Sequence, residues 1–195
     1  MALTESNMLP LGSIAPSFEL ENVLTKRKET LKSLQGKEGT LIIFMCNHCP
    51  YVIHLLEAVI EKAKKWSKQG INSVGISSNS ISTHPQDGPI EMAKLARNKN
   101  FGFPYLFDPT QDIAHAYEAA CTPDFYLFDN NLKLHYRGRF DASRPGNDQP
   151  VDGVDLQKAV DALLTMQHPL EDQWPSMGCN IKWIPGNEPQ ELNNN

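Results

Sequence analysis

The 195-residue sequence lacks several features that would point to particular classes of protein. Its formal net charge is −5, so it has no basic surface of the kind that binds nucleic acid. No apolar run approaches the roughly 18 residues needed to span a bilayer. The opening MALTESNMLPLG shows no charged region followed by an apolar one, so no secretory signal is predicted. We therefore expect a cytoplasmic protein whose partners include neither nucleic acid nor membranes.

Cysteine is also scarce. Four cysteines in a chain of this length do not make a disulfide-rich scaffold, and in a reducing compartment a close pair is more often catalytic or metal-binding than structural. The hydrophobic content of 40% and the charged content of 21% are ordinary for a globular protein, and the length suits one domain. We predict a domain over residues 10–165 and a C-terminal tail over 166–195, partly docked and partly mobile, with its last ten residues mobile.

The hydrophobic pattern predicts strands that alternate with helices. A continuous apolar run over 40–45 is typical of a buried strand, and apolar residues recur every three or four positions over 50–68, as in an amphipathic helix. Further strands are expected over 71–77 and 103–108, and helices over 90–98 and 110–119. Residues 124–140 predict a hairpin around Asn130 and Asn131, and a last helix carries Leu156 and Val160 on one face.

The motif Cys46-Asn47-His48-Cys49 lies where the strand over 40–45 passes into the helix over 50–68. A thiol reacts as its thiolate, and a helix N-terminus favours the anion because its N–H groups are unpaired there. We expect Cys46 to enter the helix as a solvent-facing nucleophile. Cys49, one turn later, would resolve a mixed disulfide on Cys46. A positive charge on His48 would lower the pKa of Cys46 further.

Two other interpretations of the cysteine pair stay open: a metal site and inert packing. A structural zinc site needs four nitrogen or sulfur ligands, usually as two close pairs. Cys121 and Cys179 each stand alone in the sequence, which leaves the metal site short of ligands. Buried cysteine can also serve as a small apolar residue.

Three segments resemble the redoxin branch of the thioredoxin superfamily, which contains alkyl hydroperoxide reductases, thiol-specific antioxidants (AhpC/TSA) and peroxiredoxins. They are GSIAPSFEL (12–20), GTLIIFMCNHC (39–49) and CTPDFYLFD (121–129). The resemblance implies an α/β, thioredoxin-like fold, with a central mixed β-sheet flanked by helices, an N-terminal extension and a C-terminal tail. It also implies a cis peptide bond before Pro123. The backbone of Thr122 would then be free to bind an extended substrate, beside Asn47.

The sequence departs from its relatives at several positions. Typical thioredoxins have Trp before the first cysteine and Gly-Pro between the two, whereas this chain has Met45 and Asn47-His48. The strand over 40–45 contains no acidic residue to assist the resolving cysteine. The Pro-x-x-x-Thr/Ser-x-x-Cys loop with which peroxiredoxins hold peroxide is missing before Cys46 and Cys49, so peroxidase activity is not expected to be the main one.

The function predicted from these residues is thiol–disulfide oxidoreduction at the Cys46–Cys49 centre. Its substrates would be disulfides or thiols of proteins or small molecules, an external dithiol would recycle it, and no bound cofactor would be needed. One alternative is a peroxiredoxin-like thiol peroxidase in which Cys46 forms a sulfenic acid. A second is a metal-binding or assembly factor that uses Cys46, Cys49 and His48. The sequence predicts no oligomeric state.

Three further residues are possible accessories to the site. Cys121 lies two positions before Pro123, and should be near the active-site surface. Cys179 lies in the tail, and could become a third redox thiol if the tail docks beside the motif. Arg139 belongs to a cationic cluster that could select acidic substrates or steady a thiolate, although a solvated edge strand is the simpler explanation.

Overall fold

The computed structural model describes residues 3–189. At its centre lies β4 (Gly39–Phe44), a strand whose six residues are all buried. It pairs in parallel with β5 (Ile71–Ser77) and antiparallel with β8 (Asp124–Asp129). A strand covered on both faces needs apolar side chains in both directions, which explains the continuous hydrophobic run.

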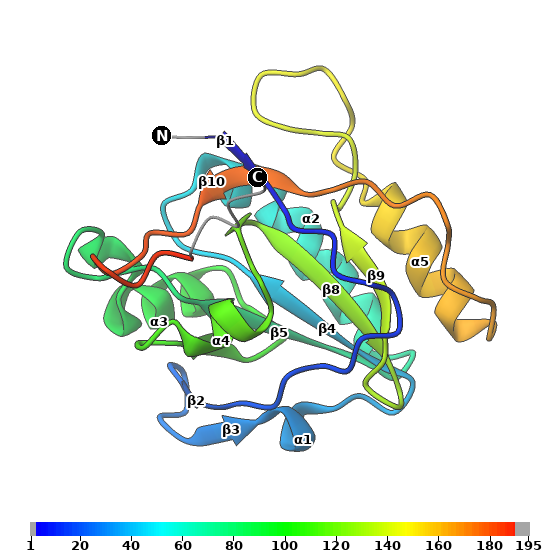
Figure 1. Cartoon of the computed structure of the whole chain (residues 1–195), viewed down its shortest axis with the longest axis horizontal. Coiled ribbons are helices and arrows are strands. Elements are labelled where there is room, and N and C mark those ends of the chain that lie inside the picture. Colours follow the sequence, from blue (N-terminus) through cyan, green and yellow to red (C-terminus); the bar gives the residue numbers. More distant parts are fainter. Residues whose placement is uncertain (1–2, 190–195) are drawn as a thin grey trace, which may run out of the picture.

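Seven strands form one mixed sheet in the order β3-β2-β6-β5-β4-β8-β9 (Figure 1). Its remaining members are β3 (Lys28–Thr30), β2 (Glu19–Asn22), β6 (Tyr105–Phe107) and β9 (Leu134–Gly138). β4, β5 and β6 run parallel, and the other pairings are antiparallel. The carboxyl ends of the parallel strands therefore meet at one edge of the sheet, which is where α/β folds commonly place their sites.

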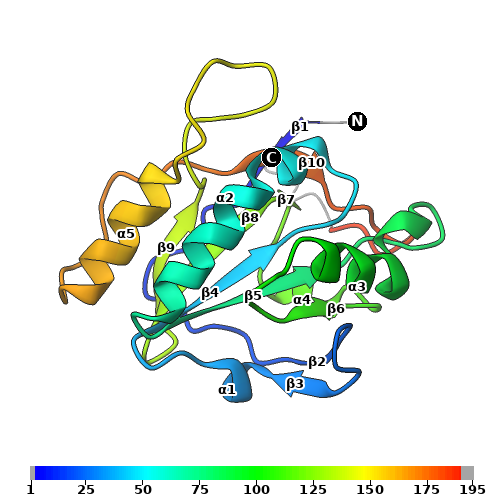
Figure 2. The same ribbon diagram turned by 180° about the vertical axis from the view of Figure 1, so that it is seen from behind.

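Helices cover both faces of this sheet. α2 (Pro50–Ser67), α3 (Pro89–Asn98) and α5 (Val154–Leu164) lie on the face seen in Figure 2 and pack on one apolar cluster. α4 (Asp112–Ala116) and α1 (Leu31–Leu34) contribute to the cluster on the opposite face. A short 3₁₀-helix, η1 (Pro85–Asp87), precedes α3. The two clusters divide β4 by the alternation of its side chains: Leu41 and Ile43 face the first, and Ile42 and Phe44 the second.

A second sheet has three strands in the order β1-β10-β7. It joins β1 (Leu3–Glu5) near the start of the chain, β7 (Cys121–Thr122) and β10 (Met177–Asn180) from the C-terminal segment. Both pairings are antiparallel. The segment after residue 166 therefore docks on the domain, although its sequence shows no periodic pattern.

The structure confirms the main predicted elements. The helix predicted over 50–68 is α2, the strands over 40–45 and 71–77 are β4 and β5, and the hairpin over 124–140 is formed by β8 and β9. The predicted boundary between residues 165 and 166 stays a prediction. The predicted mobility of the last ten residues falls largely on 190–195, which lie outside the described residues.

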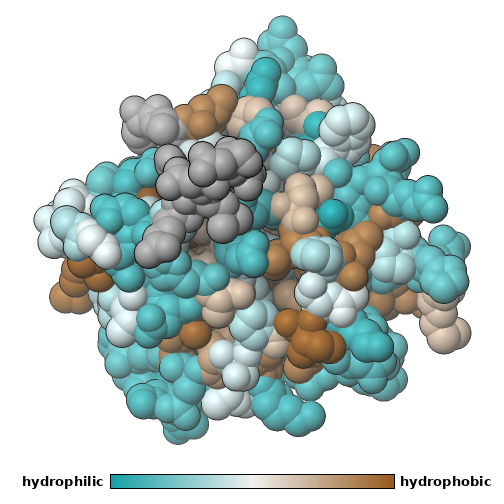
Figure 3. Space-filling model, viewed as in Figure 1, coloured by the Kyte–Doolittle hydropathy of each residue, from teal (hydrophilic) through white to brown (hydrophobic). Residues whose placement is uncertain are grey.

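Hydrophilic residues predominate on the face shown in Figure 3, with small groups of hydrophobic residues between them. The exposed large hydrophobic side chains are spread over separate elements, for example Ile90 at the start of α3, Met166 after α5 and Trp174 in the C-terminal segment. Within residues 3–189, no helix combines the length and the apolar character that crossing a bilayer requires.

Candidate active site

The five-residue connection MCNHC (45–49) joins β4 to α2. β4 ends at Phe44, and α2 begins at Pro50 with Cys49 as its N-cap. Proline suits the first helical position, where the missing N–H would have no intrahelical partner. Cys46 therefore lies in the turn, three residues before the N-cap, and the prediction that Cys46 enters the helix is wrong.

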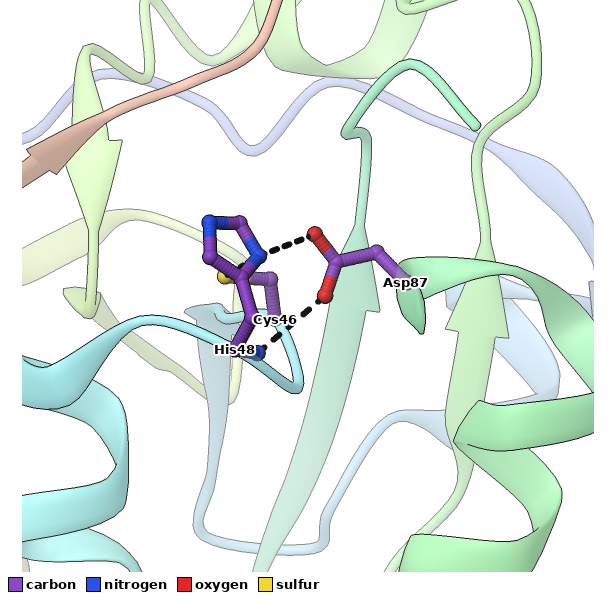
Figure 4. Close-up of side chains that lie close together, drawn as sticks. All are labelled: Cys46, His48 and Asp87. Atoms are coloured by element: carbon purple, nitrogen blue, oxygen red, sulfur yellow. Dashed lines mark hydrogen bonds and ion pairs between the residues drawn. The ribbon is translucent and has the colours of Figure 1, made fainter. Parts of the chain in front are cut away.

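The buried carboxylate of Asp87, at the end of η1, holds this turn. Its Oδ1 accepts the backbone N–H groups of Asn47 (2.8 Å) and His48 (3.2 Å). Its Oδ2 accepts Nδ1–H of His48 at 2.6 Å (Figure 4). The same oxygen accepts Nδ2–H of Asn79 at 2.8 Å. The turn's amides thus point at a carboxylate, and this is the physical reason why Cys46 does not receive the helix-type N–H groups that the sequence predicted.

The imidazole of His48 lies between Asp87 and Cys46. Its Nδ1 is 2.6 Å from the carboxylate and 3.8 Å from Sγ of Cys46. The His84 ring stacks on the His48 ring, with centroids 4.6 Å apart and an interplanar angle of 27°. Because Nδ1 donates its one hydrogen to the carboxylate, this nitrogen offers the nearby sulfur no free base.

Cys46 is buried, with only 1% of its surface exposed, so the prediction of a solvent-facing thiol is also wrong. Its sulfur lies 3.5 Å from the hydroxyl of Thr122. A hydrogen bond with Cys49 is the largest influence on its pKa and raises it, followed by burial and by the nearby charge of Asp87. The Thr122 hydroxyl acts in the opposite direction and lowers the pKa.

Cys49 is the sulfur whose anion is favoured. The hydrogen bond from Cys46 is the main cause, and with the donors Val52 N–H and Cys179 it lowers the pKa of Cys49 to about 4 against the effect of burial. When protonated, the thiol donates to the carbonyl oxygen of Thr122 at 3.2 Å. The pKa of Cys49 is thus lowered and that of Cys46 raised, which favours the anion on the sulfur at the helix N-cap.

The peptide bond between Thr122 and Pro123 is cis, as the resemblance implied. The Thr122 side chain and carbonyl face the two cysteines. Its backbone, however, is not open to a substrate in this structure, because Thr122 pairs with Cys179 of β10. The expectation of a free strand edge at Thr122 is therefore wrong: the chain's own C-terminal segment occupies it.

The three accessory candidates have different surroundings. Cys121 is buried on β7 and its Sγ lies toward the carbonyl oxygens of Pro123 and Ser176, so it is not at the surface as expected. Burial raises its pKa well above the usual range. Cys179 lies beside Cys49, with a hydrogen bond between the two side chains.

Arg139 makes structural contacts. Its Nε donates to Asp155 at 2.6 Å, and its guanidinium lies 5.5 Å from the centre of the Trp174 ring. It also lines a cleft of about 90 Å³ beside the cis-proline, together with Arg144, whose exposed guanidinium reaches Met177. The cationic cluster therefore borders the site rather than touching its sulfurs.

Two residues of the site are not evident from the sequence. Asp87 stands in the loop segment HPQDGP, where an Asp-Gly-Pro run reads as an ordinary turn. Tyr105, on β6, is fully buried and its hydroxyl donates to Oδ1 of Asn47 at 3.2 Å. Asp87 follows the carboxyl end of β5 in the chain, whereas Tyr105 is the first residue of β6, and neither position marks a role in the sequence.

Three side chains could together hold a metal ion. One ligand atom each from Cys46, His48 and Asp87 lies within 4.8 Å of the others. The carboxylate already accepts four hydrogen bonds, so metal binding would have to replace its contact with His48. Thiol chemistry at Cys46, in contrast, leaves the hydrogen bond between Asp87 and His48 in place.

Comparison with known proteins places the chain in a family. The model of the AhpC/TSA family matches residues 11–137, which is more than half of the sequence. The chain belongs to the AhpC/TSA family. The comparison with curated proteins gave no match.

Two solved structures are similar over nearly the whole chain. An uncharacterized conserved protein from Geobacillus kaustophilus is 46% identical, with 95% of this chain and 98% of that chain covered and a TM-score of 0.93. A hypothetical protein from Sinorhizobium meliloti 1021 is 40% identical, with 94% and 100% covered and a TM-score of 0.91. Both relatives therefore extend through the C-terminal segment as well.

A peroxidoxin from Mycobacterium tuberculosis matches at 18% identity, covering 82% of this chain and 99% of that chain with a TM-score of 0.62. Identity at this level shows a shared fold only. The predicted thioredoxin-like fold, with its central mixed sheet flanked by helices, is confirmed.

Proposed function

We propose that this member of the AhpC/TSA family is a thiol–disulfide oxidoreductase that uses Cys46 and Cys49 as its dithiol centre. The observation that carries the proposal is that both sulfurs meet at Thr122, whose hydroxyl lies 3.5 Å from Cys46 Sγ and whose carbonyl oxygen lies 3.2 Å from Cys49 Sγ, beside the N-cap of α2. A pair held in this way exchanges with a disulfide without a cofactor.

In the proposed reaction, Cys46 attacks one sulfur of a substrate disulfide, and its proton moves to Cys49 along their hydrogen bond. A mixed disulfide forms on Cys46, and the first product leaves as a thiolate that takes a proton from solvent. Cys49 then gives up its proton and attacks Cys46, which releases the second product as a thiol. The substrate disulfide gains two electrons and two protons, and the Cys46–Cys49 disulfide forms.

The surroundings of the sulfurs support these roles. Thr122 offers its hydroxyl to Cys46 and its carbonyl to Cys49, so one residue contacts both. The cleft beside Pro123 is bordered by Arg139 and Arg144, which would favour substrates that carry carboxylates. Both sulfurs are buried, so a protein substrate would need the covering C-terminal segment to move.

The test is a pair of single substitutions assayed with oxidised glutathione as the disulfide. We expect Cys46→Ser to lose reductase activity, and Cys49→Ser to accumulate one glutathione per molecule because the mixed disulfide on Cys46 cannot be resolved. Intact-mass measurement after acid quenching detects that adduct. Cys121→Ser serves as the control, since it removes a buried thiol whose sulfur lies toward the carbonyl oxygens of Pro123 and Ser176. Full activity of Cys46→Ser would end the proposal.

A thiol peroxidase is the alternative that family membership supports. In that reaction a peroxide would oxidise Cys46 to a sulfenic acid, and Cys49 would close the disulfide with loss of water. The hydrogen bonds of the turn's amides argue against peroxidase activity. The N–H groups of Asn47 and His48 donate to Asp87, so they cannot bind the peroxide or stabilise the charge that develops on it. Consumption of hydrogen peroxide by the reduced protein at a rate no better than free cysteine would exclude it.

A further inference from the structure

β10 lies against the active-site loop in the position of an added strand. It pairs antiparallel with β7, so that Cys179 stands opposite Thr122 and Asn180 opposite Cys121. Figures 1 and 2 both show β10 passing beside the first turn of α2. Since Thr122 contacts both Cys46 and Cys49, the pairing brings Cys179 to the same place.

The contact between β10 and the loop depends on a glycine. A Cβ added to Gly178 would overlap the carbonyl oxygen of Thr122 and lie 2.8 Å from the carbonyl carbon. The start of β10 is fixed from the other side, where Ser6 donates its N–H to Ser176 O at 2.9 Å and accepts the N–H of Ser176 at 2.8 Å. The close approach is therefore built into the backbone.

Cys179 faces the dithiol centre. Its side chain is hydrogen-bonded to Cys49, and its backbone N–H is a further donor to the same sulfur. Cys46, Cys49 and Cys179 belong to one buried cluster, and 4% of Cys179 is exposed. Three of the four cysteines of the chain thus meet at one point, although they are separated by up to 133 positions in the sequence, from residue 46 to residue 179.

We propose that Cys179 is a third redox thiol, which exchanges with the Cys46–Cys49 disulfide. The proposal rests on the proposed function, because it begins from the disulfide which that reaction leaves behind. The sulfur of Cys179 attacks the sulfur of Cys49; a Cys49–Cys179 bond forms, and the Cys46–Cys49 bond breaks. The proton of Cys179 passes to the departing sulfur of Cys46. The exchange is internal, needs no external oxidant or reductant, and conserves the oxidation state.

The exchange would return Cys46 to its thiol form while the molecule remains oxidised. The second disulfide would tie β10 to the start of α2. An external dithiol could then reduce the protein at Cys179, on the C-terminal segment, instead of at the turn where the substrate reacts. The substrate would then react at Cys46 in the turn, and the external dithiol at Cys179 in the C-terminal segment.

The experiment compares two double variants that each keep two thiols. Cys46→Ser with Cys121→Ser keeps Cys49 and Cys179; the matched control, Cys46→Ser with Cys179→Ser, keeps Cys49 and Cys121. Both are equilibrated in a glutathione redox buffer, quenched with acid, alkylated and analysed by intact mass and peptide mapping. We expect an intramolecular disulfide in the first variant, at least about 10-fold more abundant than in the control, because the pairing of β10 gives its two thiols a high effective concentration.

A third variant adds Gly178→Ala to the first and keeps both thiols. We expect its Cys49–Cys179 disulfide to be about 10-fold less abundant than in the first variant, since the new methyl group forces β10 away from Thr122. Equal amounts of the disulfide in all three proteins would overturn the proposal. Circular dichroism of the reduced proteins checks that each is folded.

If a variant does not fold, peptide mapping of the disulfides in the wild-type protein under limiting oxidant replaces it. A Cys49–Cys179 disulfide in the wild type supports the proposal directly. The outcomes separate the two proposals. If the wild type closes only Cys46–Cys49, the inference about Cys179 fails and the proposed function stands. If Cys46→Ser keeps its reductase activity, the proposed function itself fails.

Discussion

At the scale of single residues, Asp87 determines the geometry of the turn more than either cysteine does. Its carboxylate accepts hydrogen bonds from two backbone amides, one imidazole and one side-chain amide while 0% of its surface is exposed. A buried carboxylate is tolerated only when its oxygens are satisfied in this way. The sequence identifies Cys46, Cys49 and His48 by their motif. It does not identify Asp87, because a partner 39 residues from His48 leaves no local pattern.

Replacing Asp87 by Asn should therefore change both stability and thiol chemistry. The amide can accept at one oxygen only, so we expect a loss of about 2–4 kcal/mol in the free energy of unfolding. The charge that raises the pKa of Cys46 also disappears, so that pKa should fall. Urea denaturation and titration of thiolate absorbance measure the two effects. Asp108→Asn, at another buried carboxylate outside the site, is the control; an equal change in thiol titration there would contradict this role for Asp87.

Asp124 follows the cis-proline, and burial raises its pKa to about 8. Its folded-state pKa lies above the ordinary value of 3.8, so the folded protein binds more protons than the unfolded chain between these values. Stability should therefore fall as the pH rises through this window and level off above about pH 8. Asp124→Asn removes the ionisation. Between pH 5 and pH 8.5, the free energy of unfolding of the variant minus that of the wild type should therefore increase by a few kcal/mol. This is the order expected for a large pKa shift. A constant difference between the two proteins across this range would show that Asp124 ionises normally.

At the scale of elements, the site is assembled by the carboxyl ends of parallel strands. β4 leads into the cysteine turn and β5 leads toward the loop that ends in Asp87, while β6 supplies Tyr105 from its first position. The periodicity of the sequence predicts β4, α2 and β5 well because each buries a long apolar run or stripe. It does not predict β10. This strand has only four residues, and its first and last residues are half-buried. β10 forms because it pairs with β1 and β7, which are distant in the sequence.

Tyr105→Phe tests how β6 supports the turn. The lost hydroxyl donates to Asn47 Oδ1 at 3.2 Å, and its removal should cost about 1 kcal/mol of stability. Because Asn47 neighbours Cys46, we also expect a measurable change in the rate at which the reduced protein reacts with oxidised glutathione. Tyr117→Phe is the matched control, since its hydroxyl donates to Pro16 O at 2.9 Å in the other apolar cluster. The same rate change in both variants would mean that the hydroxyl has no specific role at the turn.

At the scale of the whole molecule, the reduction potential reports how differently the fold stabilises the dithiol and the disulfide. The structure gives the dithiol an anion at Cys49 with its pKa lowered to about 4, and raises the pKa of Cys46. Stabilising a thiolate stabilises the reduced form and raises the potential. We therefore expect a value at or above the cytosolic glutathione range of roughly −220 to −320 mV.

The pH dependence of that potential follows from the shared proton. Two ordinary thiols take up two protons with two electrons, and the potential then falls by about 59 mV per pH unit below their pKa. Because the pKa of Cys49 is lowered to about 4 and that of Cys46 is raised, we expect the reduced pair to hold one proton between about pH 5 and pH 8, and the potential to fall by only about 30 mV per unit. Equilibration of the Cys121→Ser protein with glutathione buffers at several pH values measures the slope without interference from that thiol. A slope near 59 mV per unit across the range would mean that both sulfurs are ordinary thiols, and that the hydrogen bond between them does not govern the chemistry of the site.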